Sequence, residues 1–338
     1  MTRINVYAEN HGWLFEDMKT WFSRLTVEGT IISVSDIPDP AADAWVALRT
    51  REAGFSPIAG RTVACVHDLY DYPGLYHPAG GRGAVHTVGG LVLCNPLQRP
   101  LLADAGIALE GKRVLERPLG ALSIFTLRES MPEKFTIGWM GRNDPRKRTE
   151  WLMETLRLVD IPRDALRVIL AGEDLEELAG ELADHGIDHR LIDRRVYPIE
   201  SCPPLYHAMD ALLITSMTEA GPLTLFEALA SGIPVVSTPV GWAPYFAGKS
   251  PGHVLLAHSP AMMAAHLSDI RRQRSTFFRD RHAIAGLVRR WRLDDWYPEV
   301  IRLAVSLIPD AGRSGPGEES FHIKHHAIHS LRSPARYL

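Results

Sequence analysis

The residues best suited to chemistry are two glutamates separated by seven residues. Glu219 comes just before a predicted helix, and Glu227 lies within the second turn of that helix. A predicted strand at residues 211–215 precedes them, so both carboxylates are expected at the carboxyl edge of a sheet, where open α/β folds bind ligands. Because a carboxylate accepts hydrogen bonds from adjacent hydroxyls, one glutamate suits a ribose diol and the other a sugar hydroxyl.

The start of the same predicted helix suits an anion. Gly221 allows a tight turn, and Pro222 fits the first helical position, because the N–H that it lacks would have no partner there. The backbone N–H groups that open the helix carry the positive end of its dipole. We therefore expect a phosphate group at this helix start.

Alternating strands and helices must position these residues. The predicted strands are residues 4–8, 30–34, 45–48, 63–66, 90–93, 135–140, 166–171, 191–197, 211–215, 234–237 and 254–257. Predicted helices lie between them at residues 14–25, 97–105, 150–159 and 175–183, and the chain is predicted to be wholly helical from Pro260 to Ile308. This alternation predicts two doubly wound α/β units with parallel sheets.

The length of 338 residues favours two domains, because a single hydrophobic core seldom grows to that size. Polar residues and Pro132 separate the two alternating halves, which places the predicted boundary after residue 126. The predicted domains are residues 1–126 and 127–309. Residues 310–338, rich in glycine at their start and in basic residues and histidine later, are predicted to form a linker and tail.

Composition indicates a water-soluble globular protein. Hydrophobic residues make up 46% and charged residues 23%, with no apolar run long enough to span a bilayer. The polar start lacks the apolar core of a secretory signal, so we expect a cytoplasmic protein. Cys65, Cys94 and Cys202 are odd in number and widely spaced, which indicates core thiols and no disulfide framework or zinc site.

The segment EAGPLTLFE, followed by ALASGIPVVST, resembles the E-x7-E signature of retaining GT-B glycosyltransferases, especially family 4. Three further segments match in order: CNPLQRPLLADAGI with RPLGALSIF, then GRNDPRK, then VILAGED. The resemblance implies two Rossmann-like domains facing a cleft, with a helical C-terminal segment. It also implies transfer of a sugar from a nucleotide-diphosphate sugar, a UDP- or GDP-sugar, with retention of anomeric configuration.

The resemblance assigns roles to individual residues. Arg142 and Lys147 would neutralise the diphosphate, Glu227 would bind ribose, and Glu219 would contact the transferred sugar. Fixed cations beside the diphosphate stabilise the charge that develops as the glycosidic bond breaks. His67 resembles a first-domain histidine near the donor sugar, and His11 competes for that role. Further donor-binding residues are expected at Gly12, Gly141, Glu173, Tyr197, Gly221, Pro222, Leu223 and Thr224.

Retention implies that the leaving phosphate accepts the proton of the acceptor, so no carboxylate is assigned as base. No two aspartates are separated by one residue, and this missing D-x-D pattern predicts a reaction without a metal. No G-x-G-x-x-G follows a predicted strand, which argues against a nicotinamide or flavin dehydrogenase. No permanently bound cofactor is expected. Ala220, Gly221 and Pro222 replace the glycine-phenylalanine-glycine common in the family and move the flexible residue by one position.

The acceptor stays open: a glycan, a lipid-linked sugar, a natural product or, as an alternative, a modified nucleic-acid base. From Arg271 to Arg292 there are eight arginines and one acid, Asp280, which suits either an anionic partner or an ordinary solvated helical face. A non-catalytic sugar-nucleotide-binding protein is a further alternative. The histidines of the tail, which begin at His322, fall at helical spacing, and a basic tail explains them more simply than a metal site.

Overall fold

The computed structural model of the protein describes residues 1–9, 13–67, 85–104, 106–219 and 221–309. Met1–Ile308 forms one compact unit. The predictions for Gly12, for His11 and for the tail from residue 310 onward therefore lie outside the described residues.

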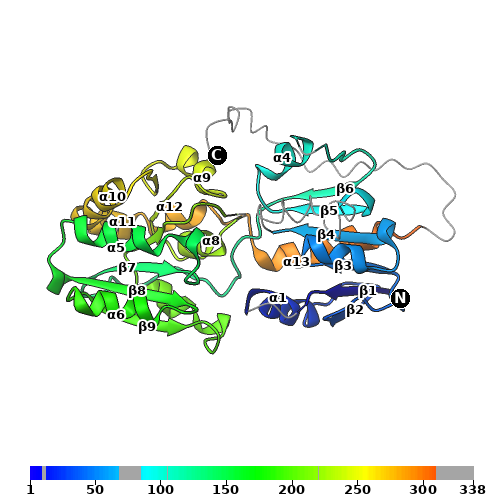
Figure 1. Ribbon diagram of the computed structural model, residues 1–338, viewed down its shortest axis with the longest axis horizontal. Coiled ribbons are helices and arrows are strands. Elements are labelled where there is room, and N and C mark those ends of the chain that lie inside the picture. Colours follow the sequence, from blue (N-terminus) through cyan, green and yellow to red (C-terminus); the bar gives the residue numbers. More distant parts are fainter. Residues whose placement is uncertain (10–12, 68–84, 105, 220, 310–338) are drawn as a thin grey trace. The chain divides into compact units, whose positions relative to one another are not determined.

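A six-stranded, wholly parallel sheet occupies the first third of the chain (Figure 1). Its strand order is β2-β1-β3-β4-β5-β6. The strands are β1 Thr2–Tyr7, β2 Thr30–Ser35, β3 Ala44–Ala47, β4 Thr62–Val66, β5 Gly90–Leu93 and β6 Arg113–Glu116. The order reverses between β1 and β3, so the loops after these strands flank the switch point of this first sheet.

A second six-stranded parallel sheet follows, with the order β12-β11-β10-β7-β8-β9. Its strands are β7 Phe135–Met140, β8 Leu166–Gly172, β9 Asp188–Asp193, β10 Ala211–Ile214, β11 Val235–Ser237 and β12 Val254–Leu256. Counted from β7, this is the doubly wound order 3-2-1-4-5-6, whose switch point lies between the first and fourth strands. Ligands are therefore expected beyond the carboxyl ends of β7 and β10.

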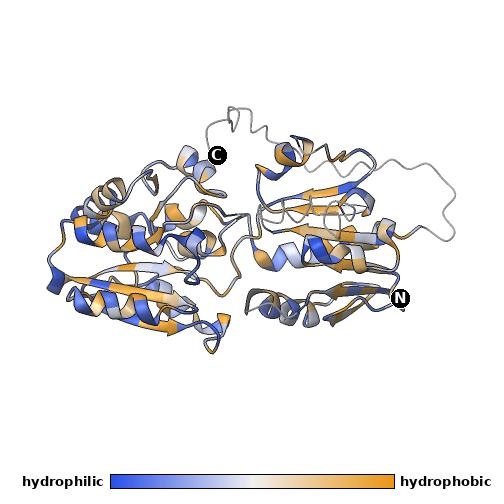
Figure 2. Ribbon diagram, in the orientation of Figure 1, coloured by the Kyte–Doolittle hydropathy of each residue, from blue (hydrophilic) through white to orange (hydrophobic). Residues whose placement is uncertain are grey.

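Helices connect the strands, as parallel pairing requires. They are α1 Trp13–Ser23, α4 Gln98–Asp104, α5 Thr149–Leu158, α6 Glu176–Asp184, α7 Pro203–His207, α8 Leu223–Ala230, α9 Ala243–Lys249, α10 Pro260–Arg272, α11 Arg274–Arg279, α12 Arg281–Gly286 and α13 Leu293–Val305. Short 3₁₀ turns occur at Thr50–Phe55, Ala59–Arg61, Pro145–Lys147, Arg163–Ala165 and Ile199–Ser201. The strands of both sheets are mostly hydrophobic, whereas the helices mix polar and apolar residues (Figure 2).

The last helix returns to the first sheet. α13 contacts β1, β3, β4, β5 and β6, although α12 before it packs on α8. On the way back the chain runs beside its own outgoing segment: Ala121 and Arg292 form a parallel bridge, and the Leu293 N–H donates to the Ala121 carbonyl at 2.9 Å. Gly120 permits this approach, because a Cβ there would lie 2.3 Å from the Trp291 carbonyl oxygen.

The predicted α/β fold with two doubly wound sheets is confirmed, with local corrections. The strand expected at residues 191–197 is instead β9, Asp188–Asp193, and its hydrophobic extension at Val196 is 81% exposed. The stretch from Pro260 to Ile308 is not wholly helical, because residues 287–292 form turns and the bridge to Ala121. β6, whose first and last residues are exposed, was not predicted. The domain boundaries themselves stay predictions.

Candidate functional site

Two loops meet at the switch point of the second sheet, one after β7 and one after β10. The Thr215 hydroxyl donates to the Lys147 carbonyl, and the Met217 N–H donates to the Arg146 carbonyl at 2.7 Å. The Arg148 guanidinium donates to the Ser216 carbonyl at 3.1 Å. Hydrogen bonds to backbone carbonyls therefore hold together the loop that carries the predicted cations and the loop that carries the first glutamate.

Lys147 and Glu219 form an ion pair between these loops. The Lys147 ammonium donates to Glu219 Oε1, and the Ser216 hydroxyl donates to the same oxygen at 2.7 Å. The lysine side chain is 26% exposed and the glutamate side chain 16%, so the pair is shielded but still open to solvent on one side. The structure thus brings together two residues that lie 72 positions apart in the sequence.

The other basic residues of the loop after β7 are arranged differently. Arg142 is exposed, whereas Arg146 binds both carboxylate oxygens of Asp144. This hydrogen bonding lowers the pKa of Asp144 to about 2. The loop also depends on Gly172, since a Cβ there would lie 1.6 Å from the Gly141 carbonyl oxygen.

α8 begins just after Glu219, where the sequence predicts an anion site. Pro222 is the N-cap of α8 and Leu223 its first residue, so the helix starts one position later than the sequence predicted. Gly221 does not have a positive φ, and its use is close packing: a Cβ there would lie 3.2 Å from the Cys94 carbonyl oxygen. Leu223 and Thr224 are partly exposed at this helix start.

Glu227 lies deeper than Glu219, on α8. The side chain is buried, and the Tyr206 hydroxyl donates to Glu227 Oε2. Burial raises the pKa of Glu227 to about 7, although the Tyr206 hydrogen bond and the charge of Arg194 act to lower it. At neutral pH this carboxyl is therefore poised between its two protonation states.

Arg194 follows β9 and lies between carboxylates. Its guanidinium is 6% exposed, donates to the Tyr197 carbonyl, and lies 3.6 Å from Asp17 Oδ2 on α1. Burial raises the pKa of Asp17 to about 6, against the lowering effect of Arg194. This arginine was not singled out from the sequence, where it lies beside Arg195 in an otherwise ordinary loop.

His67 lies at the end of β4 in the first sheet. Its Nδ1 is 3.7 Å from the Cys94 sulfur, and its ring makes edge contacts with Phe15 and lies near Trp296. Burial lowers the pKa of His67 to about 4, so the imidazole is neutral at physiological pH. Its Nε2 is covered and has no hydrogen-bond partner among the described residues.

Glu173 and Tyr197 contribute through their backbones. The Glu173 carbonyl accepts from the Asn143 N–H at 3.0 Å, which joins the loop after β8 to the loop after β7. Tyr197 packs against the core, and its carbonyl accepts from Arg194. The Glu173 contact places that residue beside the loop after β7, whereas the Tyr197 contact lies in the loop after the edge strand β9.

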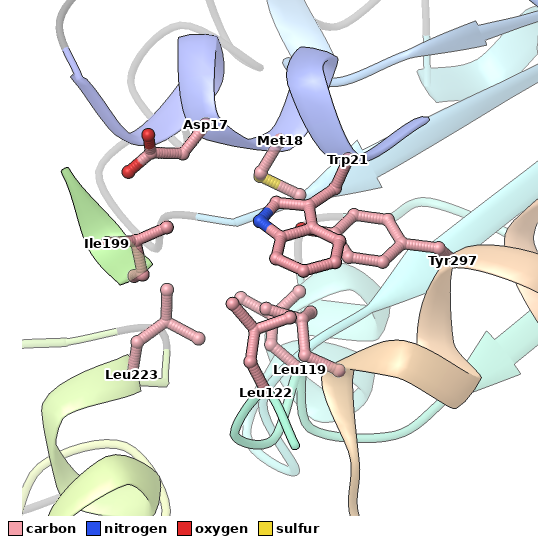
Figure 3. Close-up of a pocket in the computed structure, with 9 residues that line it drawn as sticks. Asp17, Met18, Trp21, Leu119, Leu122, Ile199, Leu223 and Tyr297 are labelled. Atoms are coloured by element: carbon pink, nitrogen blue, oxygen red, sulfur yellow. The ribbon is translucent and has the colours of Figure 1, made fainter. Parts of the chain in front are cut away.

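A small, mostly apolar pocket lies next to the start of α8 (Figure 3). Leu223 and Ile199 line it from one side. Side chains of α1, of α13 and of the segment that contains Leu119 and Leu122 line it from the others. The lining residues are Asp17, Met18, Trp21, Leu119, Leu122, Ile199, Leu223, Leu293 and Tyr297. Asp17 is the single ionisable carboxylate among them, and the pocket therefore offers little to a charged ligand.

Sequence reasoning missed two residues that join the first sheet to this site. The Asn95 side-chain amide donates to the Glu219 carbonyl at 3.1 Å, and the Trp242 indole N–H donates to the Cys94 carbonyl at 2.7 Å. Asn95 belongs to a segment that carried the family resemblance, whereas Trp242 lies four residues after one. The Asn-Pro pair after β5 was the available signal, since asparagine in that position commonly forms a local turn.

The arginine-rich segment from Arg271 to Arg292 is partly built into the structure. Arg274 donates to Asp210 and to the carbonyls of residues 132–134, and Arg281 stacks on Phe278. Arg290 donates to the Tyr245 hydroxyl at 2.8 Å and stacks on Trp291. Five of its eight arginines are exposed: Arg272, Arg279, Arg289, Arg290 and Arg292. The segment thus makes separate contacts along several short helices and still exposes basic side chains.

A protein-family model and a curated protein each match part of this chain. Residues 134–273 match the family model described as glycosyl transferases group 1. A curated relative, D-inositol 3-phosphate glycosyltransferase of Corynebacterium efficiens, is 30% identical over 146 residues. That match covers 40% of this chain and 34% of the relative, so the two proteins align over about a third of the relative's length.

Solved structures extend the likeness to most of the chain. Anabaena HepE in complex with UDP and glucose aligns with a TM-score of 0.69 at 15% identity, over 90% of this chain and 100% of HepE. Sucrose-phosphate synthase from Thermosynechococcus elongatus aligns with a TM-score of 0.69 at 11% identity, over 91% and 99% of the two chains. Within the described residues, none of the helices has the length and hydrophobicity to cross a bilayer. The solved structures show that the fold is GT-B.

Proposed function

We propose that the protein is a retaining, metal-independent, family 4-like glycosyltransferase that uses a UDP- or GDP-sugar as donor. The observation that carries the proposal is the Lys147–Glu219 ion pair at the switch point of the second sheet, beside the start of α8. The cation and the helix N-terminus at this edge suit the negatively charged diphosphate of a sugar nucleotide, and the carboxylate suits its hydroxyls.

The diphosphate is expected to compete with Glu219 for Lys147. Without donor, the lysine is neutralised by Glu219. A diphosphate at the start of α8 would draw the ammonium toward its oxygens, together with the exposed Arg142, and free the Glu219 carboxylate for a sugar hydroxyl. Both cations then stabilise the negative charge that grows on the leaving diphosphate.

Glu227 is proposed to hold the ribose of the donor. Its Oε2 already accepts from Tyr206, which fixes the carboxyl and leaves the other oxygen for a ribose hydroxyl. HepE has been solved with UDP-glucose, and the pneumococcal O-GlcNAc transferase GtfA with UDP and GlcNAc, which makes a UDP-sugar the first donor to test. The acceptor is left open between a glycan, a lipid-linked sugar, a natural product and a nucleic-acid base.

A thermal-shift panel of UDP-, GDP-, ADP- and dTDP-sugars tests the donor. A ligand that binds only the folded protein adds about 2.7 kcal/mol of stability at a hundredfold excess over its Kd, so the correct donor raises Tm clearly. Arg142→Ala should abolish the shift without lowering the Tm of the free protein, since Arg142 is exposed. Arg272→Ala, another exposed arginine, serves as the matched control and should keep the shift.

The stereochemistry and the metal are tested on slow donor hydrolysis. The anomer first released from an α-linked donor, read by NMR before mutarotation, should be α for a retaining reaction. Activity should persist in excess EDTA. A panel in which no sugar nucleotide raises Tm, or in which Arg142→Ala and Arg272→Ala behave alike, contradicts the proposed function and favours a protein without this activity.

A further inference from the structure

The backbone of the Glu219 loop is held between two neighbours that come from different sheets. On one side, the Asn95 amide donates to the Glu219 carbonyl at 3.1 Å. On the other, Gly241 presses on Pro222, since a Cβ at Gly241 would lie 2.8 Å from the Pro222 ring and 3.5 Å from the Glu219 carbonyl oxygen. The position of this loop therefore depends on a residue of the first sheet as well as on the second.

Asn95 is itself rigidly held. Its Oδ1 accepts from the Leu97 N–H at 2.8 Å, and its own N–H donates to Gln98 Oε1 at 3.0 Å. Asn95 is 3% exposed and Gln98 is fully buried. Because both ends of the Asn95 amide are used, its side chain is locked in one rotamer with the N–H₂ group directed at Glu219.

Gln98 extends the chain of hydrogen bonds to β4. Its side-chain amide donates to the Val66 carbonyl at 2.7 Å, directly before His67. The series Val66, Gln98, Asn95, Glu219 therefore connects the end of β4 with the loop that carries the first glutamate. Trp242 adds a parallel link, because its indole N–H donates to the Cys94 carbonyl at 2.7 Å.

We propose that Asn95, fixed by Gln98, is a positioning residue for sugar transfer: it sets the Glu219 loop relative to His67 and the first sheet. The inference rests on the proposed function and adds to it a residue that touches neither donor nor acceptor. A buried, fully used amide between two sheets holds geometry, and small displacements of a reacting group cost large factors in rate.

Asn95→Asp isolates the link to Glu219. The aspartate keeps the Oδ1 acceptor for Leu97 and so preserves the local turn, but it replaces the N–H₂ donor with an oxygen that faces the Glu219 carbonyl. Asn5→Asp is the matched control. Asn5 is also fully buried in the first sheet, and its amide donates only to residues of that sheet, Ser33 and Ser35, at 3.1 and 2.9 Å.

Two measurements on the full chain decide the matter. Hydrogen exchange of the peptide around residues 217–226, without any ligand, should be about tenfold faster in Asn95→Asp than in wild type, as loss of one hydrogen bond implies. The kcat for UDP-glucose hydrolysis should fall about tenfold or more with KM changed less than threefold. Asn5→Asp should change neither by more than about twofold.

Trp242→Phe keeps the aromatic ring and removes only the indole donor, so it tests the second link if Asn95→Asp is too unstable to assay. It should show the same split, with kcat lowered and KM nearly unchanged. Unchanged exchange and unchanged kcat in both variants, or equal losses in Asn5→Asp, would overturn the positioning role. Failure of the proposed function looks different, because wild-type protein would then neither bind nor hydrolyse any sugar nucleotide of the panel.

Discussion

Polar groups at the carboxyl edges of the two sheets differ in their hydrogen bonding and in their exposure to solvent. At the second sheet, charges are paired and accessible: Lys147 is joined to Glu219, and Glu219 also accepts from Ser216. At the first sheet, they are covered and poorly satisfied: among the described residues, His67 Nε2 and both carboxylate oxygens of Glu52 have no hydrogen-bond partner. Glu52 is 1% exposed and forms an ion pair with Arg49 at 3.7 Å.

This difference indicates separate tasks for the two edges. Paired, solvent-facing charges exchange partners at little cost when a charged ligand arrives, which suits a diphosphate. A buried polar group without a hydrogen-bond partner carries a desolvation cost in free energy. A ligand whose hydroxyls form hydrogen bonds with that group would offset this cost. We therefore assign the donor diphosphate to the second edge and a neutral, hydroxyl-bearing part of the reaction, the donor sugar or the acceptor, to the first.

The largest effect is expected at the second edge. Lys147→Met keeps the length of the side chain and removes the charge that we propose to lie beside the leaving diphosphate, so donor turnover should fall about a hundredfold or more. Lys134→Met is the control, because Lys134 lies just before β7, at the opposite end of that strand from Lys147, and pairs with Asp188 at 2.8 Å. Steady-state kinetics should show Lys134→Met within about twofold of wild type. Similar losses in both variants would erase the distinction between the two ends of the sheet.

A second prediction compares the buried glutamates of the two edges. Burial raises the pKa of both Glu227 and Glu52 from 4.5 to about 7. A raised carboxyl pKa means stability that is complete below the unfolded value and is lost as the pH rises through the folded value. Glu227→Gln and Glu52→Gln should each reduce the loss in free energy of unfolding between pH 5 and pH 8.5 by about 3 kcal/mol, measured by urea denaturation.

The two glutamine variants should differ in donor binding. Glu227→Gln is expected to weaken binding of the nucleotide, because it replaces one oxygen that we propose to bind ribose, whereas Glu52→Gln should leave the nucleotide affinity within about twofold. Calorimetric titration with UDP measures this. If the stability of the wild type does not decline over this pH range, burial does not raise the pKa of either carboxyl. Weaker UDP binding in Glu52→Gln would contradict the proposal that the nucleotide binds only at the second edge.

The sequence predicted the second edge better than the first, for a physical reason. Glu219, Gly221 and the start of α8 lie within a few residues of one another, and Lys147 follows a strand with clear hydrophobic character, so local pattern located them. Because the carboxyl ends of parallel strands lie at the same edge of a sheet, the loops that carry Lys147 and Glu219 were expected to lie close together. The pairing of Lys147 with Glu219 in preference to Arg142 did not follow, since it depends on the path of the loop after β7.

The first edge depends on contacts between distant segments, which a single sequence does not reveal. Asn95 looked like an ordinary turn residue after β5, and its link to Glu219 spans 124 positions. Arg194 looked like one of two adjacent surface arginines, yet only Arg194 is buried against Asp17. α13 returns to the first sheet and places Trp296 beside His67. Helical periodicity predicts the helix but does not predict which sheet the helix packs against.

The smallest effect is expected at His67. Burial lowers its pKa to about 4, so it acts as a neutral imidazole, and a lowered histidine pKa gives stability that is present above the unfolded value of 6.5 and is lost as the pH falls through 4. His67→Phe should remove this acid-induced loss. If Nε2 binds a hydroxyl of a substrate, the same variant should lower kcat for donor turnover about tenfold, the value of one hydrogen bond.

His253→Phe is the matched control, because His253 also packs edge-on against an aromatic ring, Phe277, but lies in the second half of the chain, before β12. The control should keep wild-type kcat. Between pH 6 and 8, the kcat of the wild type should show no inflection from His67, since a group with a pKa of about 4 does not titrate there. An inflection near pH 6.5 that His67→Phe abolishes would mean that the first edge binds charge after all, and the contrast between the two edges would fail.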